Sequence, residues 1–99
     1  MGHVRTLQAN SDLDEIWYYV ASHSGSLEIA DRLIDSITER FVLLANYPNL
    51  GRARDADLRP DLRSFTIGEY IIIYRIRGAD VVILRVLRGS RNMEILFDS

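Results

Sequence analysis

The hydrophobic positions of the chain follow two different periods, one in each half. In residues 12–22 the apolar side chains recur three or four positions apart, as they do on one face of an amphipathic helix; they are Leu13, Ile16, Trp17 and Val20. Ser11 precedes this segment as a candidate N-cap, and Asp14 occupies the acidic position of a capping box. The pattern therefore predicts a helix over residues 12–22.

A second helix is predicted between Ser26 and Pro48. Ser26 can cap its first turn, and Pro48 cannot continue it because proline has no backbone N–H to donate. One apolar stripe runs along this segment and comprises Ala30, Leu33, Ile34, Ile37, Phe41, Leu44 and Ala45. Because only a short turn separates the two helices, we expect them to pack as an antiparallel hairpin.

The second half of the chain has the patterns of β-strands. Residues 62–67 alternate between apolar and polar, and Gly68-Glu69 fits a two-residue hairpin turn with glycine first. Residues 70–76 and 81–87 are apolar on both faces, as central strands are. Residues 4–7 form a weak candidate for a short first strand, and residues 48–61 have the composition of a long loop.

These elements together predict an α+β domain, in which a two-helix hairpin and a short N-terminal strand accompany a small antiparallel sheet. The 99 residues fit a single domain spanning 1–99. Two helices can cover only one face of such a sheet, whereas its central strands are apolar on both faces. The sequence therefore predicts an exposed apolar groove, which is typical of a protein that binds a partner.

Composition excludes several classes of protein. There is no cysteine, so neither a disulfide framework nor a cysteine-based zinc site is possible. No apolar run reaches the roughly 20 residues that a membrane span needs, and the first residues lack the apolar core of a signal peptide. We therefore expect a cytoplasmic protein that does not bind membranes.

All 12 basic residues are arginines, and they are unevenly distributed. Residues 1–50 hold three arginines against seven acids, whereas residues 51–99 hold nine against seven. The net charge of −2 argues against direct DNA binding by the chain alone, but it is compatible with a local arginine site.

Four arginines are candidates for such a site or for a structural role. Arg85 lies within an apolar strand and must find a partner or emerge at an edge of the sheet. Arg63 is as compatible with a structural role, bonded to acids or backbone carbonyls of the sheet, as with a functional one. Arg88 and Arg91 follow that strand, which favours a role facing a partner.

Other candidate chemistry is weak. The two histidines, His3 and His23, have no sequence context that indicates catalysis. The acids Asp12, Asp14 and Glu15 stand at the predicted start of a helix, where carboxylates are ordinarily dipole partners rather than metal ligands. We expect neither a metal nor a cofactor.

An ordered set of segments resembles the ParE-type toxins of the RelE/ParE superfamily. The segments are residues 12–19 (DLDEIWYY), 45–52 (ANYPNLGR), 62–65 (LRSF), 68–75 (GEYIIIYR) and 82–91 (VILRVLRGSR). The whole resemblance spans roughly residues 4–97, and the segments follow the family's order and spacing. The family fold, a helix hairpin on a small antiparallel sheet, is the one that the residue pattern predicts.

The resemblance implies the toxin half of a type II toxin–antitoxin pair. It implies a hetero-oligomer with a cognate, ParD-like antitoxin, whose amphipathic C-terminal segment would fill the apolar groove. Candidate residues for that groove are Ile16, Tyr19, Val20, Leu33, Ile37, Phe65 and Tyr74. ParE-type toxins are known as inhibitors of DNA gyrase, and Arg88, Arg91 and Phe97 are the candidates for contacting that target.

RelE-type relatives instead cut mRNA on the ribosome, and the residues weigh against that activity here. The arginine that such ribonucleases carry after the tyrosine of the central strand corresponds to Ile71, and their terminal tyrosine corresponds to Phe97, which has no hydroxyl. A ribonuclease would have to rely on Arg63, Arg88 and Arg91. The sequence thus favours a non-enzymatic binding inhibitor, with a ribonuclease or a protein that only forms complexes as alternatives.

Overall fold

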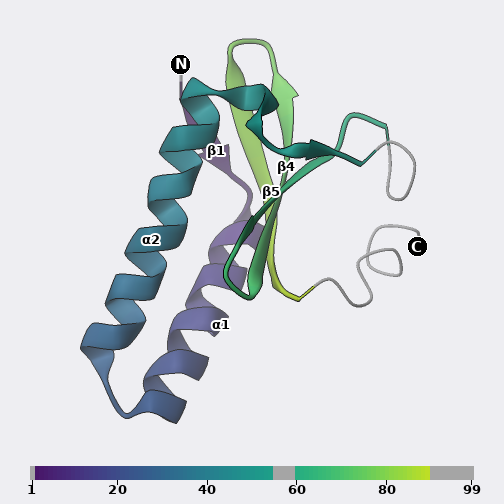
Figure 1. Ribbon diagram of the computed structural model, residues 1–99. Helices are drawn as coiled ribbons and strands as arrows, with labels where there is room; N and C mark the ends of the chain where they lie inside the picture. The colour runs from purple at the N-terminus through teal and green to yellow at the C-terminus, as the bar shows by residue number, and fades with distance from the viewer. Residues whose placement is uncertain (1, 55–59, 90–99) are drawn as a thin grey trace.

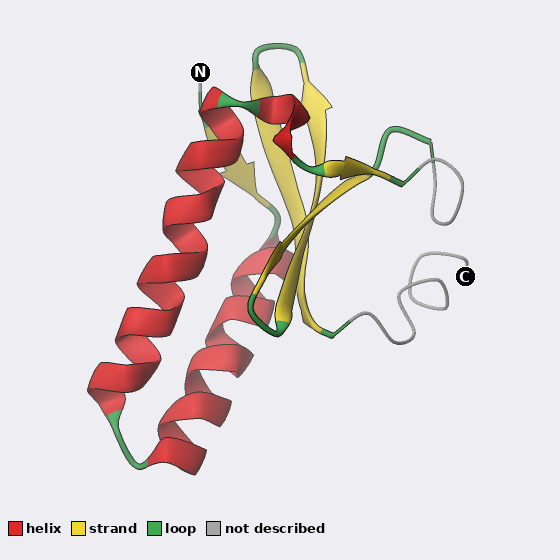
Figure 2. Ribbon diagram, viewed as in Figure 1, coloured by secondary structure: helices red, strands yellow, loops and turns green. Residues whose placement is uncertain are grey.

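A computed structural model describes residues 2–54 and 60–89, which form a five-stranded sheet and a helical hairpin. The hairpin packs on one face of the sheet (Figures 1 and 2). In chain order the elements are β1 (His3–Arg5), α1 (Leu7–Ser24), α2 (Leu27–Asn46), the 3₁₀ helix η1 (Pro48–Leu50), β2 (Arg52–Ala53), β3 (Arg63–Ile67), β4 (Tyr70–Arg77) and β5 (Asp80–Arg88). The strand order is β1-β5-β4-β3-β2, with β1 parallel to β5 and the other pairs antiparallel. The predicted α+β class is confirmed.

Helix α1 begins five residues before the predicted start. Its N-cap is Thr6, whose hydroxyl oxygen accepts a hydrogen bond from the backbone N–H of Ala9 at 3.0 Å. Ser11 therefore lies inside the helix, and the predicted capping box is wrong. Asp12 consequently falls in the second turn, on the side of the helix that is buried.

The second helix begins and ends where the sequence predicts. The Ser26 hydroxyl accepts a hydrogen bond from the backbone N–H of Ile29, and the helix ends at Asn46, two residues before Pro48. Trp17 is half-buried, and its indole N–H donates to the Asp31 carboxylate at 2.8 Å. It therefore joins α1 to α2 at the edge of the hairpin rather than filling the core.

Two tight turns organise the antiparallel strands. Ile67 is opposite Tyr70, so Gly68-Glu69 forms the predicted two-residue turn, in which Gly68 has a φ of 57° that glycine adopts without strain. A second two-residue turn, Gly78-Ala79, joins β4 to β5. The long loop predicted over residues 48–61 includes η1 and β2, neither of which the residue pattern indicated.

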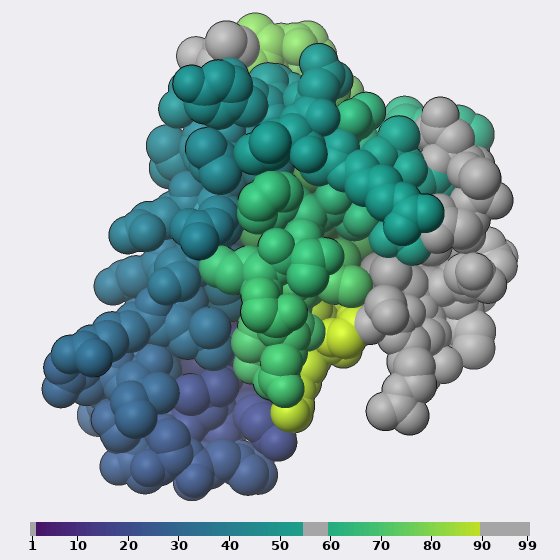
Figure 3. All heavy atoms as spheres, in the orientation of Figure 1, coloured from purple at the N-terminus to yellow at the C-terminus, as the bar shows by residue number. Residues whose placement is uncertain are grey.

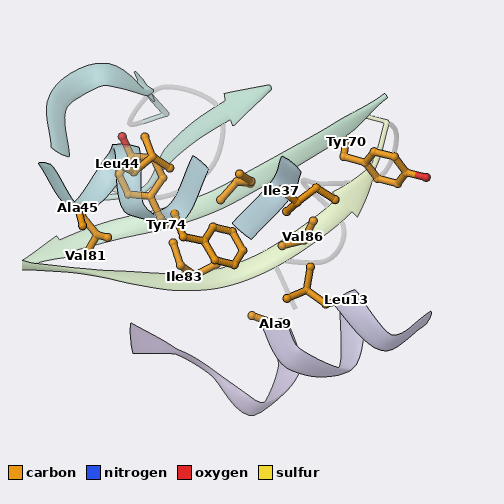
Figure 4. Packing of buried hydrophobic residues seen from close by; sticks show 12 residues of the cluster. Ala9, Leu13, Ile37, Leu44, Ala45, Tyr70, Tyr74, Val81, Ile83 and Val86 are labelled. Carbon is orange, nitrogen blue, oxygen red and sulfur yellow. The ribbon is translucent and has the colours of Figure 1, made fainter. Parts of the chain in front are cut away.

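The main core lies between the hairpin and the sheet (Figure 4). Its buried members are Ala9, Leu13, Ile37, Phe41, Leu44, Ala45, Tyr70, Ile72, Tyr74, Val81, Ile83 and Val86. The register between β4 and β5 shifts at Ile73/Tyr74, which leaves Leu84 as an additional residue in β5. Because of this bulge, Val86 faces the helices like Val81 and Ile83, although strict alternation would place Arg85 there.

A second, smaller apolar cluster confirms that the two helices cover only one face of the sheet. Its buried members are Leu62, Ile71 and Ile73, and Leu84 and Leu87 pack against them. These three side chains are at most 7% exposed. The prediction of an open apolar groove is therefore wrong for this face.

Candidate functional site

A pocket of about 320 Å³ lies between α1 and the C-terminal part of β5. Its lining residues are Asp12, Glu15, Ile16 and Tyr19 from α1, Tyr70 from β4, and Arg85, Val86, Leu87 and Arg88 from β5. The four α1 residues are spaced i, i+3, i+4 and i+7, so they form one face of the helix. The space-filling view shows the end of β5 (yellow) beside the helical hairpin (purple and blue), at the lower edge of the molecule (Figure 3).

The buried wall of this pocket is an ion pair between helix and sheet. Arg85 binds the Asp12 carboxylate side-on, with Nε 2.8 Å from Oδ2 and Nη2 3.1 Å from Oδ1. The same Oδ2 accepts the backbone N–H of Val86 at 2.9 Å, and Gln8 donates to Oδ1 at 3.4 Å. The hydrogen bond from Arg85 to Asp12 is the main cause that raises the pKa of Arg85. Each charge in this pair is therefore neutralised by the other.

This ion pair forms where β5 lacks a neighbouring strand. β1 pairs only with Val81, Val82 and Ile83, so the remaining backbone groups on that edge of β5 need other partners. Thr6 supplies two of them: its N–H donates to the carbonyl of Ile83 at 3.1 Å and its hydroxyl donates to that of Leu84 at 2.9 Å. The Asp12 carboxylate then takes the N–H of Val86. The first turns of α1 thus continue the hydrogen bonding that β1 begins.

The exposed rim of the pocket is cationic and aromatic. The guanidinium carbon of Arg88 lies 4.9 Å from the centroid of the Tyr19 ring, and the ring of His23 stacks on Tyr19 at 3.9 Å. A hydrogen bond with Tyr19 is the main cause that raises the pKa of Arg88, so this residue stays charged at any physiological pH. Burial raises the pKa of Tyr70, whose hydroxyl points away from the core cluster in Figure 4. Tyr70 therefore remains a hydrogen-bond donor at neutral pH.

The pocket has the groups of a binding site. Its buried carboxylate is engaged by Arg85, and the side chains of Ile16, Val86, Leu87 and Tyr19 provide apolar or aromatic surface. The lining is completed by Glu15, Tyr70 and Arg88. In residues 2–54 and 60–89 no group of three or more acidic or histidine side chains is placed to hold a metal ion. Within the same ranges, no helix is long and apolar enough to cross a membrane.

Several predicted site residues lie together in this pocket, and others do not. Ile16, Tyr19 and Arg88 are among its lining residues. Val20, Leu33 and Phe65 are half-buried elsewhere, and Leu33 and Phe65 pack against the main core. Arg91 and Phe97, which were predicted to contact the target, are outside the described residues.

The inclusion of Ile37 and Tyr74 among the groove residues was wrong. Both side chains are completely buried in the main core, so neither can line an open groove. The apolar stripe that contains Ile37 faces the sheet, and Tyr74 faces that stripe from β4. Periodicity indicates which side of an element is apolar, but it does not indicate whether another element already covers that side.

Arg63 has a structural role, which was one of the two roles that the sequence allowed for it. Its guanidinium donates to the backbone carbonyl of Gly51 at 2.8 Å and to that of Asn49 at 3.1 Å. Next to it, the Tyr74 hydroxyl accepts the N–H of Gly51 at 2.9 Å and donates to the carbonyl of Pro48 at 2.7 Å. Together these two side chains hold η1 against the sheet.

The remaining residues of the pocket were not predicted as contacts of a partner; they are Asp12, Glu15, Tyr70, Arg85, Val86 and Leu87. The burial of Asp12 could have been predicted from the residue pattern, but the start of the helix was predicted five residues too late. With the helix beginning at Leu7, Asp12 lies on the same stripe as Ala9, Leu13 and Ile16, where a carboxylate needs a buried partner. Nothing in the local pattern distinguishes Tyr70 from a core residue.

Comparisons with known proteins agree with this fold. Residues 4–93 match a sequence model of the family described as the ParE toxin of the type II toxin–antitoxin system, parDE. The chain is 40% identical to Toxin ParE3 of Caulobacter vibrioides over 94 residues, which cover 94% of this chain and 92% of that protein. It is 33% identical to Toxin RelE3 of the same organism over 79 residues, covering 80% and 84% of the two chains.

A solved structure supports the same assignment. It is described as a chromosomal ParDE TA system from P. aeruginosa, and it superposes with a TM-score of 0.78 at 27% identity, covering 91% of this chain and 97% of that one. The residues that match the family model, 4–93, include both helices and the strands β4 and β5 that line the pocket. The chain therefore belongs to the family of ParE toxins of type II toxin–antitoxin systems.

Proposed function

We propose that this toxin inhibits DNA gyrase by binding to it, without catalysing a reaction, and that a cognate ParD-like antitoxin neutralises it in a hetero-oligomer. The observation that carries the proposal is the composition of the pocket between α1 and β5. Its buried charges, Asp12 and Arg85, satisfy one another, and the cation at its rim is stacked on Tyr19. Paired and stacked charges of this kind can hold a partner's side chain, and they are not free to exchange a proton as an acid–base catalyst must be. The other ionisable side chains that line the pocket with them are those of Glu15 and Tyr70.

Family membership supports both halves of the proposal. The matched family is that of the ParE toxins, and the resemblance to ParE-type toxins implies gyrase as the target. The similar solved structure is named as a ParDE system, which favours an antitoxin partner. We further propose that the protein acts in the cytoplasm and that it binds neither DNA by itself nor a membrane.

A supercoiling assay tests the proposal. Purified toxin is titrated into gyrase, relaxed plasmid and ATP, and heat-denatured toxin serves as the control. We expect supercoiling to cease at a molar excess of toxin and to return when the cognate antitoxin is added. Normal supercoiling at a large excess of folded toxin would contradict gyrase as the target.

A ribosome-dependent mRNA endonuclease is the second candidate function, because Toxin RelE3 is also similar to this chain. Against it, Arg63 already donates to two backbone carbonyls, so it would have to leave η1 to reach a phosphate. Mapping of transcript 5′ ends after induction separates the two functions. We expect intact transcripts, whereas new ends that disappear with Arg91→Ala would favour the nuclease.

A further inference from the structure

We propose that two copies of this toxin associate through the outer face of α1, in a symmetric pair of antiparallel helices. We call this surface the α1 outer face; it is an open groove of about 520 Å³ lined by Asp14, Glu15, Tyr18, Tyr19, Ser22 and His23. All six residues are exposed. The inference goes beyond the proposed function and does not depend on gyrase being the target.

A tyrosine without a partner stands at the centre of the α1 outer face. The side chain of Tyr18 is 70% exposed, and within residues 2–54 and 60–89 it makes no hydrogen bond or ring contact. Tyr19 beside it is 42% exposed. Tyrosine is enriched in protein–protein interfaces, because its ring buries a large apolar area and its hydroxyl can still be hydrogen-bonded.

The order of the residues along α1 makes this surface complementary to itself. In a two-fold symmetric dimer each residue meets a second residue, and that residue meets the first in return. If the symmetry axis passes between Tyr18 and Tyr19, Asp14 and His23 both lie about 7 Å from it along the helix, because the rise is about 1.5 Å per residue. Asp14 of each copy is then level with His23 of the second copy. Glu15 is likewise level with Ser22.

His23 is oriented to donate a hydrogen bond outward. Its Nδ1 lies 2.8 Å from the carbonyl oxygen of Tyr19. A carbonyl oxygen can only accept, so Nδ1 carries a proton and Nε2 remains for another partner. A protonated imidazole donates from Nε2 to a carboxylate, and a neighbouring carboxylate favours that protonated form. Asp14 of the second copy supplies this carboxylate.

The charges also determine the direction of the helix pair. In a parallel pair, Asp14 and Glu15 would face the same two acids of the second copy, and like charges brought together at an interface weaken binding. In the antiparallel pair, the acids of the two copies are about 10 Å or more apart along the helix axis. The α1 outer face therefore favours one arrangement of two copies over the other.

The position and length of this surface indicate how strong the association is. Figure 1 shows that the second half of α1 extends past the edge of the sheet, where the strands do not obstruct a second helix. The stretch from Asp14 to His23 is about 15 Å long, so the contact is smaller than the roughly 1,200 Å² that stable interfaces bury. We therefore expect a weak dimer, with a dissociation constant in the micromolar range or above.

A charge swap tests the inference by sedimentation equilibrium of the purified toxin. Asp14→Arg places cations opposite one another and His23→Asp places acids opposite one another, and symmetry repeats each change. We expect either variant to raise the dissociation constant of the dimer about tenfold or more. The double variant Asp14→Arg/His23→Asp should return it to within about threefold of the unmodified value. Glu39→Arg, with the same charge change at an exposed position of α2, should alter it less than about twofold.

The aromatic centre is tested by Tyr18→Ala, with Tyr47→Ala as the matched control. Tyr47 is 63% exposed and follows the last residue of α2. We expect Tyr18→Ala to weaken the dimer about tenfold or more and Tyr47→Ala to change it less than about twofold. Because both side chains are exposed, circular dichroism of the two variants should match that of the unmodified protein.

The antiparallel register is tested by disulfide cross-linking, because the chain contains no cysteine of its own. A mixture of Glu15→Cys and Ser22→Cys should form a covalent dimer on mild oxidation. Either variant alone should not, because its two new sulfurs would lie about 10 Å apart along the helix, and a disulfide requires Cα atoms within about 7 Å.

Three results would overturn the inference. The first is a toxin that sediments as a monomer up to low millimolar concentration, in which case the groove has another occupant, such as a basic segment of a different protein. The second is a dimer that neither Asp14→Arg nor Tyr18→Ala weakens. The third is cross-linking of Ser22→Cys alone as efficient as that of the mixture. Gyrase inhibition by the unmodified toxin is measured separately, so the proposed function can fail or hold independently of these results.

Discussion

Replacing Asp12 with alanine should destabilise the fold by about 3 kcal/mol, because this carboxylate satisfies several groups at once. It is 5% exposed and accepts hydrogen bonds from Arg85, from the backbone N–H of Val86 and from Gln8. An orphaned buried N–H costs about 1–3 kcal/mol, and removing one partner of a buried ion pair costs about 3–5 kcal/mol. The side chain of Arg85 is 22% exposed and can turn partly to water, so the total lies near the lower end of these ranges.

The assay is urea denaturation followed by fluorescence of Trp17 and by far-ultraviolet circular dichroism. Coincident transitions indicate two-state unfolding, for which a loss of about 3 kcal/mol is a large part of the 5–15 kcal/mol typical of a domain. In a domain of this size it also lowers Tm by roughly 15 °C, since about 1 kcal/mol corresponds to 4–8 °C.

A double-mutant cycle identifies the cause. Arg85→Met removes the other charge, so the destabilisation in Asp12→Ala/Arg85→Met should be at least about 1 kcal/mol less than the sum of the two single effects. Additive effects, or a loss of less than about 1 kcal/mol in Asp12→Ala, would refute the view that this ion pair holds α1 against the edge of β5.

Three further predictions concern the rest of the fold. Tyr74→Phe should cost about 1–3 kcal/mol in urea denaturation because it leaves the buried N–H of Gly51 without its acceptor, and an unchanged midpoint would contradict this. Gly51→Ala should destabilise as well, since a Cβ there would lie 2.8 Å from the backbone oxygen of Ser64; equal thermal stability would show that the strands can separate to admit it. Thr6→Ala should cost about 1–2 kcal/mol by removing the cap of α1 and the bond to Leu84, whereas the control Thr38→Ala, within α2, should cost little; similar losses in both would argue against a capping effect.

A fourth prediction concerns His3, whose pKa is lowered by burial and then by the charge of Arg5. The folded state therefore binds a proton at His3 less readily than the unfolded state does. The contribution of neutral His3 to the free energy of unfolding is fully present above about pH 6.5, the ordinary pKa of histidine. It is lost as the pH falls through the lower pKa of the folded state. NMR titration should give a midpoint below the ordinary value that rises in Arg5→Gln. A midpoint at the ordinary value that Arg5→Gln does not move would contradict this cause.

The parts of the fold that depend on neighbouring residues could be predicted from the sequence. Ser26 caps α2 through an N–H three residues away, and Gly68-Glu69 closes a hairpin whose strands are adjacent in the chain. The exception is the start of α1, because the capping-box pattern at Ser11 and Asp14 was stronger than the signal at Thr6. Thr6 also binds the carbonyl of Leu84, a contact that no local pattern reveals.

The site was less predictable because it depends on residues distant in the chain. Asp12 and Arg85 are separated by 73 positions, and the sequence indicated only that Arg85 needs a partner. The bulge at Leu84, which removes Arg85 from the core face, is a property of strand register and has no marker in the residue pattern. Arg88 and Tyr19 are likewise distant in the chain, so we predicted them on two separate surfaces. In the structure the two side chains are in contact.

The most direct test of the central claim, that this toxin acts by binding gyrase, is isothermal titration of the purified toxin into intact gyrase. The account predicts saturable binding with a fixed stoichiometry, weakened in Arg88→Ala and unchanged in the control Arg77→Ala, since Arg77 is an exposed arginine at the end of β4 that is distant from Arg88. Absence of binding at concentrations that arrest growth when the toxin is expressed would contradict it.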